Sequence, residues 1–151
     1  MELDSKMSYI KKANELFEQK YHCSQAVLGA FAKDLGITEK QALKLGACFG
    51  GGMCKGEGCG ACAGALMVLG LKYGQCEVED VASRLKTNSI TEKFLDLFKY
   101  ENGSYLCKEL LGCDLATKDG KEYARKHKLF TEFCPNMVAS AVKITEQLLN
   151  E

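Results

Sequence analysis

The sequence predicts an all-α fold: a single-domain bundle of about six or seven helices, with a buried central helix after a loop rich in glycine and cysteine. Three observations support this prediction. Apolar residues recur every three or four positions in most segments, which is the period of an amphipathic helix. No segment alternates apolar and polar residues between turn signals, as a half-buried strand would. No linker rich in proline or serine divides the chain, so we expect one domain over residues 1–151.

Three helices are expected before the glycine-rich loop. The stretches 5–21 and 23–36 each carry an apolar stripe at helical spacing, and the second ends at a glycine suited to a left-handed cap. The stretch 38–50 opens with Thr38 and has Gln41 three residues later, which is the signature of a capping box. The first stripe consists of Met7, Ile10, Ala13, Leu16 and Phe17.

The middle of the chain predicts the buried helix and a longer partner. The stretch 60–74 is apolar almost all round, which is typical of a helix enclosed by others. Gly60 and Gly64 lie one turn apart on it and would let a neighbouring backbone approach closely. The stretch 77–103 is expected to form one long helix or two, with a weak point at residues 87–89.

Three further helical segments are expected toward the C-terminus. The stretch 104–112 predicts a short helix closed by a glycine, and 119–127 predicts one or two turns. The stretch 134–150 has Pro135 at its expected first helical position. Its apolar face consists of Met137, Val138, Ala141, Ile144 and Leu148.

Charge and hydropathy exclude several classes of function. The 20 basic and 20 acidic residues cancel, so no basic stripe indicates nucleic-acid binding. The N-terminal stretch is polar and mixed in charge, unlike a signal peptide. No apolar run reaches the roughly 18 residues that a membrane helix needs. We therefore expect a soluble, cytoplasmic protein without membrane insertion.

Nine cysteines are the outlier in this composition. The odd number and the lack of an export signal argue against a disulfide framework. In a reducing compartment such a set is more typical of metal binding or redox chemistry, although any one cysteine can simply be a buried small residue.

Three cysteines fall at predicted helix starts: Cys23, Cys59 and Cys134. A helix N-terminus offers free N–H donors and a partial positive charge, which stabilise a thiolate and lower its pKa. Cys107 is expected inside the short helix 104–112, from which it could face the other three. Four thiolates around a common centre suit zinc or an iron–sulfur cluster. Amides near Cys59, from Gly58 and Gly60, could then donate to the sulfurs.

Four sequence elements resemble a known family. They are "CSQAVL" at Cys23, "CGACAG" from Cys59, "CKELLGCDL" at Cys107, and Cys134 ahead of the last helix. Together they resemble small bacterial and archaeal proteins that are named for a C…CGAxxG…C…C pattern and described as redox-active. The resemblance covers residues 9–149. It implies an all-helical domain, four functional cysteines at these positions, a redox role and iron–sulfur binding.

The remaining cysteines depart from that pattern. Cys62 fills a variable position of the CGAxxG element and forms a Cys-x-x-Cys pair with Cys59. A local dithiol of these two residues is therefore an alternative to a site built from all four family cysteines. No βαβ pattern surrounds the pair, which argues against thioredoxin architecture. Cys48, Cys54, Cys76 and Cys113 are interpreted as incidental thiols. His22 and His127 are interpreted as ordinary surface residues.

Several functions remain open on the sequence alone. The first hypothesis is electron transfer by a 2Fe–2S cluster on Cys23, Cys59, Cys107 and Cys134, in exchange with an unidentified redox partner protein. The second is a metal-free thiol–disulfide oxidoreductase or redox sensor, with Cys59 as nucleophile. The third is a zinc-binding or helical partner-binding domain. If the protein is an enzyme, we expect an oxidoreductase with Cys59 and Cys134 as catalytic thiols. A homodimer is left open.

Overall fold

The computed structural model describes the backbone of residues 2–151 and the side chains of residues 9–151; Met7 of the first apolar stripe thus lies outside the described side chains. The all-α prediction is confirmed, because the described residues form helices and no strand. The elements are α1 (Glu2–Glu18), α2 (Cys23–Phe31), the 3-10 turn η1 (Ala32–Leu35), α3 (Glu39–Gly46), the π turn η2 (Gly52–Gly56), α4 (Gly60–Tyr73), α5 (Val81–Asn102), α6 (Cys107–Leu111), α7 (Lys118–Lys126), α8 (Leu129–Glu132) and α9 (Cys134–Leu149).

The expected six or seven helices are too few, since residues 2–151 contain nine α-helices. The surplus lies in the C-terminal third, where the chain is cut into short pieces. Lys128 takes a left-handed conformation with φ 57°, which ends the run begun by α7 and starts α8 as a separate single turn. A non-glycine residue at positive φ is uncommon, so sequence periodicity alone does not reveal this break.

Several local predictions are confirmed. Thr38 Oγ1 accepts a hydrogen bond from the Gln41 N–H at 3.0 Å, while Gln41 Oε1 accepts from the Thr38 N–H, as a capping box requires. Residues 81–102 form one continuous helix, α5. The polar stretch 87–89 does not break it, because the Thr87 hydroxyl bonds back to the Ser83 carbonyl at 3.1 Å instead of competing with the helix.

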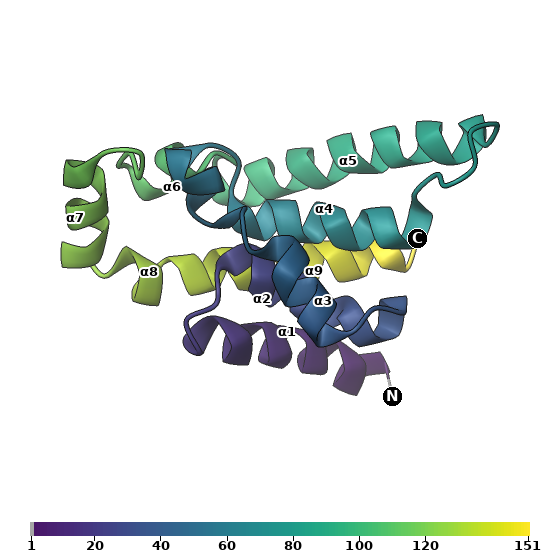
Figure 1. The fold of residues 1–151 in the computed structure, drawn as a ribbon, viewed down its shortest axis with the longest axis horizontal. Coiled ribbons are helices and arrows are strands. Elements are labelled where there is room, and N and C mark those ends of the chain that lie inside the picture. The colour runs from purple at the N-terminus through teal and green to yellow at the C-terminus, as the bar shows by residue number, and fades with distance from the viewer. Residues whose placement is uncertain (1) are drawn as a thin grey trace.

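The long helices lie side by side, and the short helices gather at one end. Figure 1 shows α5, α4 and α9 running along the length of the molecule, with α1 to α3 beside them and α6, α7 and α8 at one end. Helix α4 is buried or half-buried over residues 60–69, whereas Gly70, Leu71 and Lys72 are exposed. The backbone of α2 approaches α4 at Gly64, where an added Cβ would lie 2.6 Å from the Ser24 carbonyl oxygen.

Buried apolar side chains form two separate clusters. The main core is drawn from α1 to α5 and α9 and includes Phe31, Val68, Phe94, Phe98 and Val142. The small cluster lies on the side of α6 and α7 and consists of Cys107, Leu111, Leu115 and Ala124. Within residues 2–151, no helix is both long enough and apolar enough to cross a membrane.

Candidate functional site: a pocket lined by four cysteines

All four predicted cysteines stand where a helix begins. Cys23 is the first residue of α2, Cys134 the first of α9, and Cys59 immediately precedes α4. Cys107 was expected inside a helix that starts near Ser104, but it is the first residue of α6. The preceding residues are extended, which makes Cys107 a fourth helix start. Pro135 is the second residue of α9 rather than the first.

A short pairing of two extended segments explains why α6 begins late. Gly58 and Leu106 form an isolated antiparallel bridge. The Cys59 N–H donates to the Tyr105 carbonyl at 2.7 Å, and the Cys107 N–H donates to the Glu57 carbonyl at 2.6 Å. Two cysteines separated by 48 positions in the sequence are thus fixed on either side of one pair of backbone hydrogen bonds.

The glycine-rich loop forms a left-handed turn. Gly51, Gly52, Met53 and Cys54 have consecutive φ values of 63°, 61°, 58° and 60°. Only glycine adopts this conformation without strain, and each of the other two residues adds on the order of 1 kcal/mol. The turn brings the Gly51 N–H to the sulfur of Cys23, to which it donates a hydrogen bond. Strained backbone of this kind is typical of functional sites.

Two glycines leave room for the groups that surround Cys23. A Cβ on Gly60 would lie 2.4 Å from Cys23 Sγ and 3.0 Å from the Phe49 carbonyl oxygen. A Cβ on Gly50 would lie 2.2 Å from His22 Nδ1. Both distances are shorter than van der Waals contact, so any larger residue would displace the side chain next to it.

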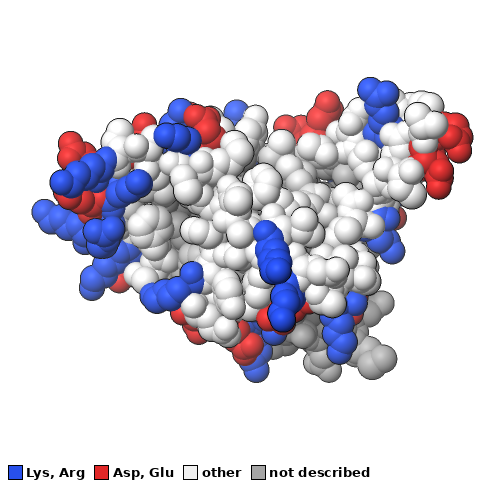
Figure 2. All heavy atoms as spheres, viewed as in Figure 1, with Lys and Arg blue, Asp and Glu red and all other residues white. Residues whose placement is uncertain are grey.

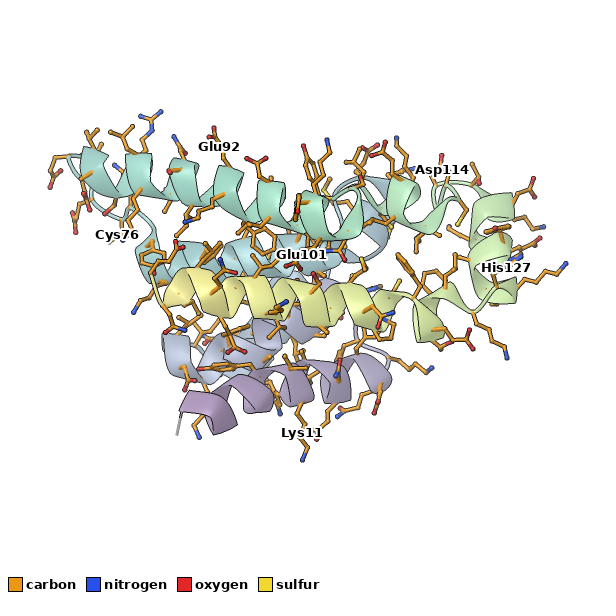
Figure 3. The ribbon with its side chains drawn as sticks, turned by 180° about the vertical axis from the view of Figure 1, so that it is seen from behind. Lys11, Cys76, Glu92, Glu101, Asp114 and His127 are labelled. Carbon is orange, nitrogen blue, oxygen red and sulfur yellow. The ribbon has the colours of Figure 1, made fainter. Side chains whose placement is uncertain are left out.

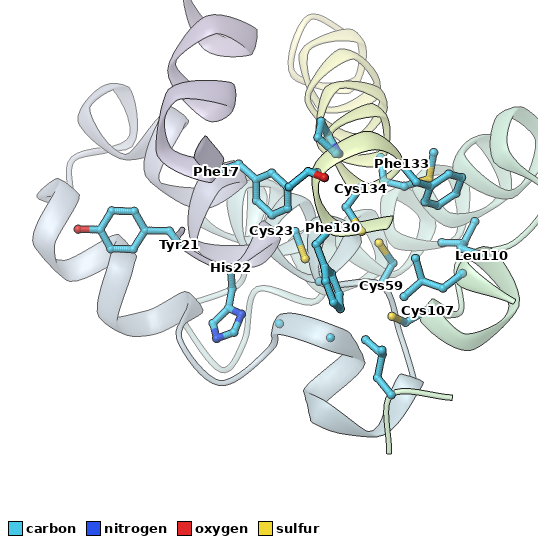
Figure 4. A pocket seen from close by; sticks show the side chains of 18 of the residues that line it. Phe17, Tyr21, His22, Cys23, Cys59, Cys107, Leu110, Phe130, Phe133 and Cys134 are labelled. Carbon is cyan, nitrogen blue, oxygen red and sulfur yellow. The ribbon is translucent and has the colours of Figure 1, made fainter. Parts of the chain in front are cut away.

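The four cysteines line one pocket of about 560 Å³. Figure 4 shows Cys23, Cys59, Cys107 and Cys134 around this pocket, in the same region as Phe130. Cys23 and Cys59 belong to the main core and its margin, whereas Cys107 and Cys134 belong to the small cluster and its margin. The pocket therefore opens where the two clusters meet, and each cluster contributes two thiols.

Among Cys23, Cys59, Cys107 and Cys134, only Cys59 has a lowered pKa. The Cys62 thiol donates a hydrogen bond to the Cys59 sulfur, and this bond is the main reason why the pKa of Cys59 falls from 9.0 to about 7. The N–H groups of Cys62 and Ala61 lower this pKa further, whereas burial opposes the change. The same hydrogen bond, together with burial, raises the pKa of Cys62 far above its ordinary value. Cys59 is 7% exposed and Cys62 is 3% exposed, so the pair shares one proton in a largely dry environment.

The other three thiols do not follow the prediction of lowered pKa values at helix starts. Burial and the charge of Cys59 raise the pKa of Cys23 to about 12, despite N–H donors from Gly51 and Ser24. Burial and the charges of Cys59, Cys23 and Cys113 raise the pKa of Cys107 to about 12. Burial and the neighbouring thiolates, Cys23 first, also raise the pKa of Cys134. Desolvation and mutual repulsion outweigh the helix N-terminus at these positions.

The other predicted residues divide between the pocket and the rest of the molecule. Gly60 lines the pocket, whereas Gly58 forms the bridge and does not. Cys54 and His22, interpreted from the sequence as incidental, both line the pocket.

The remaining four cysteines and His127 do not line this pocket: Cys48, Cys62, Cys76 and Cys113. Figure 3 shows that Cys76 lies at the opposite end of the molecule from His127.

Sequence reasoning missed three cations and several aromatic residues of the pocket. Lys20, Lys121 and Arg125 line it, together with Phe17, Tyr21, Phe130 and Phe133. The only sequence signal was the spacing of Lys121 and Arg125, which places both on one face of a helix. Nothing in the sequence placed that face beside the cysteines.

The described pocket thiols do not form a ready-made metal-binding group. Among the side chains of residues 9–151, no group of three or more His, Cys, Asp or Glu residues is positioned to hold a metal ion. This arrangement does not favour zinc, which needs four donors in a tetrahedron at about 2.3 Å. A two-iron cluster takes two thiolates on each iron and therefore requires pairs of thiols rather than four at one point.

The comparison with known proteins identifies the family of this chain. Residues 21–148 match the model of the family described as "Putative redox-active protein (C_GCAxxG_C_C)", and the chain belongs to this family. The match includes all four pocket cysteines and supports a redox role. No curated protein and no solved structure gave a significant match.

Proposed function

We propose that Cys23, Cys59, Cys107 and Cys134 together hold an iron–sulfur cluster, most simply of the 2Fe–2S type, and that the protein carries electrons. The proposal rests on one observation: thiols from positions 23, 59, 107 and 134 line the same pocket. When bound, the cluster would supply a redox centre whose potential depends on hydrogen bonds and burial.

The surroundings of the thiols fit such a group. The Gly51 amide donates to Cys23 Sγ, and the amides of Ala61 and Cys62 donate to Cys59 Sγ. Amide donors of this kind stabilise thiolate ligands and raise the reduction potential of a cluster. The missing side chain at Gly60 keeps Cys23 Sγ beside the start of α4.

Protonation links this binding to pH. Cys23, Cys107 and Cys134 have raised pKa values and must each release a proton before they can act as ligands. Iron would offset the repulsion between thiolates that raises these pKa values. Cluster binding is therefore expected to weaken as the pH falls.

We also propose a cytoplasmic location and a redox partner protein. All nine cysteines are unpaired, which suits the cytoplasm, where thiols are kept reduced. Electrons would be exchanged with a separate redox protein through the pocket, which Cys59 and Cys107 line although both are almost fully buried.

Anaerobic purification tests the proposal. We expect a coloured protein with iron and inorganic sulfide, whose visible absorption is lost in Cys59→Ser and in Cys134→Ser. Cys76→Ser is the matched control, since Cys76 is exposed and does not line the pocket. Iron-free protein obtained after anaerobic reconstitution would contradict the proposal.

The Cys59–Cys62 hydrogen bond supports a second candidate function, thiol–disulfide exchange without metal. The Cys59 thiolate would attack a substrate disulfide, form a mixed disulfide and release one substrate thiolate. The Cys62 thiol would then lose its proton, attack Cys59 Sγ and release the second thiolate. The substrate gains two electrons, and the protein is left with a Cys59–Cys62 disulfide.

A trapping experiment distinguishes this candidate from the cluster. Iron-free protein treated with a small disulfide should lose two hydrogens in mass, and Cys62→Ser should instead accumulate a mixed disulfide on Cys59. Cys48→Ser is the control, because Cys48 is exposed and outside the pocket. If Cys62→Ser behaves like this control, Cys62 does not resolve the intermediate.

A further inference from the structure

Three cations line the pocket without partners of opposite charge. Lys20 lies in the turn between α1 and α2, and Lys121 and Arg125 lie on α7. None of the three forms an ion pair with any of the side chains described in residues 9–151, where the ion pairs involve other lysines. Glu18 is the one acidic residue in the pocket lining. The lining therefore carries an excess of positive charge.

The placement of these cations is unfavourable by itself. Lys121 and Arg125 are four residues apart on α7, so their like charges share a helix face and repel each other. Lys20 takes a left-handed conformation with φ 79°, which is strained for a residue other than glycine. A bound anion would offset this repulsion, since none of the described carboxylates forms an ion pair with these cations.

The wall of the pocket is apolar and aromatic. Phe17, Tyr21, Phe130, Phe133 and Leu110 contribute to it. Phe130 is 40% exposed although it lines the pocket, so its ring is open to an incoming molecule. Figure 2 shows that Lys and Arg side chains gather at the end of the molecule formed by α7 and α8. An apolar wall with a few convergent charges is typical of a small-molecule site.

We propose that this pocket binds a small organic anion, with its apolar or aromatic body against Phe17 and Phe130 and its carboxylate or phosphate group near Lys121 and Arg125. The site goes beyond the redox chemistry of the thiols. The proposed anion site does not depend on whether the four cysteines hold an iron–sulfur cluster or Cys59 and Cys62 act as a dithiol, because its cations and aromatic wall are separate from these thiols.

A pair of isosteric probes tests the charge requirement. Calorimetric titration of the purified protein with 2-naphthoate and with 2-naphthamide compares an anion with its neutral counterpart, and colour from a cluster does not interfere. We expect 2-naphthoate to bind about 5- to 10-fold more tightly at low salt, and the difference to shrink at high salt. Equal affinities for the two probes, or no binding of either, would overturn the proposal.

Matched double variants separate the pocket from general charge. Lys121→Gln with Arg125→Gln should weaken 2-naphthoate binding about 5- to 10-fold and leave 2-naphthamide unchanged. Lys118→Gln with Lys126→Gln removes the same charge from α7 at residues that do not line the pocket, and should change neither affinity. If both double variants weaken the binding of 2-naphthoate equally, or if the Lys121/Arg125 variant weakens the binding of both probes, the assigned anion site is wrong.

Thiol protection gives an independent readout. Occupancy by 2-naphthoate should slow alkylation of Cys54, which is exposed and lines the pocket, and leave the exposed Cys48 and Cys76 unchanged. An acidic redox partner is the competing occupant of this basic end. If polyglutamate binds in a manner lost in the Lys121/Arg125 variant while 2-naphthoate does not protect Cys54, the surface docks a protein and the small-anion site is overturned.

Discussion

The two hydrophobic clusters that meet at the pocket differ greatly in size. Among the described side chains, the main core contains 23 buried residues, whereas the small cluster contains four. Burial of a large apolar side chain stabilises a fold by about 1.5–3 kcal/mol, so the main core can support itself and the small cluster cannot. The region of α6 to α8 therefore depends on what connects it to the main core.

Several connections cross between the two regions. The backbone bridge joins Glu57–Cys59 to Tyr105–Cys107, Phe133 packs against both clusters, and Leu110 of α6 packs against the main core. The ion pair between Lys108 and Glu57, at 3.7 Å, is about half exposed and contributes at most about 1 kcal/mol. The proposed iron–sulfur cluster would add a further link, because two of its four cysteine ligands come from each side. We therefore expect that such a cluster would also help to hold the α6–α8 region in place.

The largest expected effect contrasts Phe94 with Leu115. Phe94→Ala empties a fully buried site in the main core and should lower the free energy of unfolding by about 3–5 kcal/mol. Leu115→Ala should lower the free energy of unfolding by less and should loosen only the α6–α8 region. Urea denaturation measures the first effect, and hydrogen exchange locates the second. Faster exchange in α4 and α9 of Leu115→Ala would mean that the two clusters act as one core.

A smaller effect is expected from Gly60→Ala. The new Cβ would lie 2.4 Å from Cys23 Sγ, so the substitution should lower the free energy of unfolding by about 1–3 kcal/mol and displace Cys23 from the pocket. Gly70→Ala on the same helix meets no atom within 4 Å and should stabilise by up to about 1 kcal/mol. Thermal unfolding and iron content measure both variants. Equal stability of the two would show that Gly60 is not a close contact.

Removal of the proposed iron–sulfur cluster should mainly loosen the side of the pocket formed by the small hydrophobic cluster. Chelation of iron under anaerobic conditions is expected to speed hydrogen exchange in residues 107–133 about tenfold, which corresponds to about 1.4 kcal/mol. Exchange in α2 should change less than twofold, because the main core remains packed. Uniform acceleration along the chain would contradict the view that the site ties the small cluster to the main core.

The smallest expected effect concerns the pH dependence of Cys59. In iron-free protein, its alkylation should rise as the pH passes through about 7, where the thiol loses its proton. Cys62→Ala removes the thiol donor but keeps the backbone N–H, so the pKa of Cys59 should rise and its alkylation at pH 7 should slow. Cys48 provides the internal control. An unchanged pH profile would show that Cys62 does not act on Cys59.

Much of the fold followed from local patterns. The apolar periodicity of residues 5–21 and 134–150 predicted α1 and α9, and the Thr38–Gln41 capping box marked the start of α3. The late start of α6 could not be read locally, because it depends on Gly58, a residue 48 positions before Leu106. The separate α8 could not be read either, because it follows from an unusual φ at Lys128.

The candidate site was predicted in part. Helix-start positions identified Cys23, Cys59 and Cys134, the expected helix 104–112 added Cys107, and the family pattern names all four; the structure places them on one pocket. The roles of these residues as ligands or catalytic thiols stay predictions. Cys54, Lys121 and Arg125 were missed, because their neighbours in space are remote in sequence.

The sequence by itself determined that this chain is helical and rich in cysteine, and it predicted a redox role for these thiols, because hydrophobic period and residue type are local properties. Only the tertiary structure decided which thiol is acidic. Cys59 has a neighbouring thiol donor, whereas burial and the charges of distant cysteines raise the pKa values of Cys23, Cys107 and Cys134. Desolvation and electrostatic repulsion depend on distances through space, and those exist only once the chain has folded.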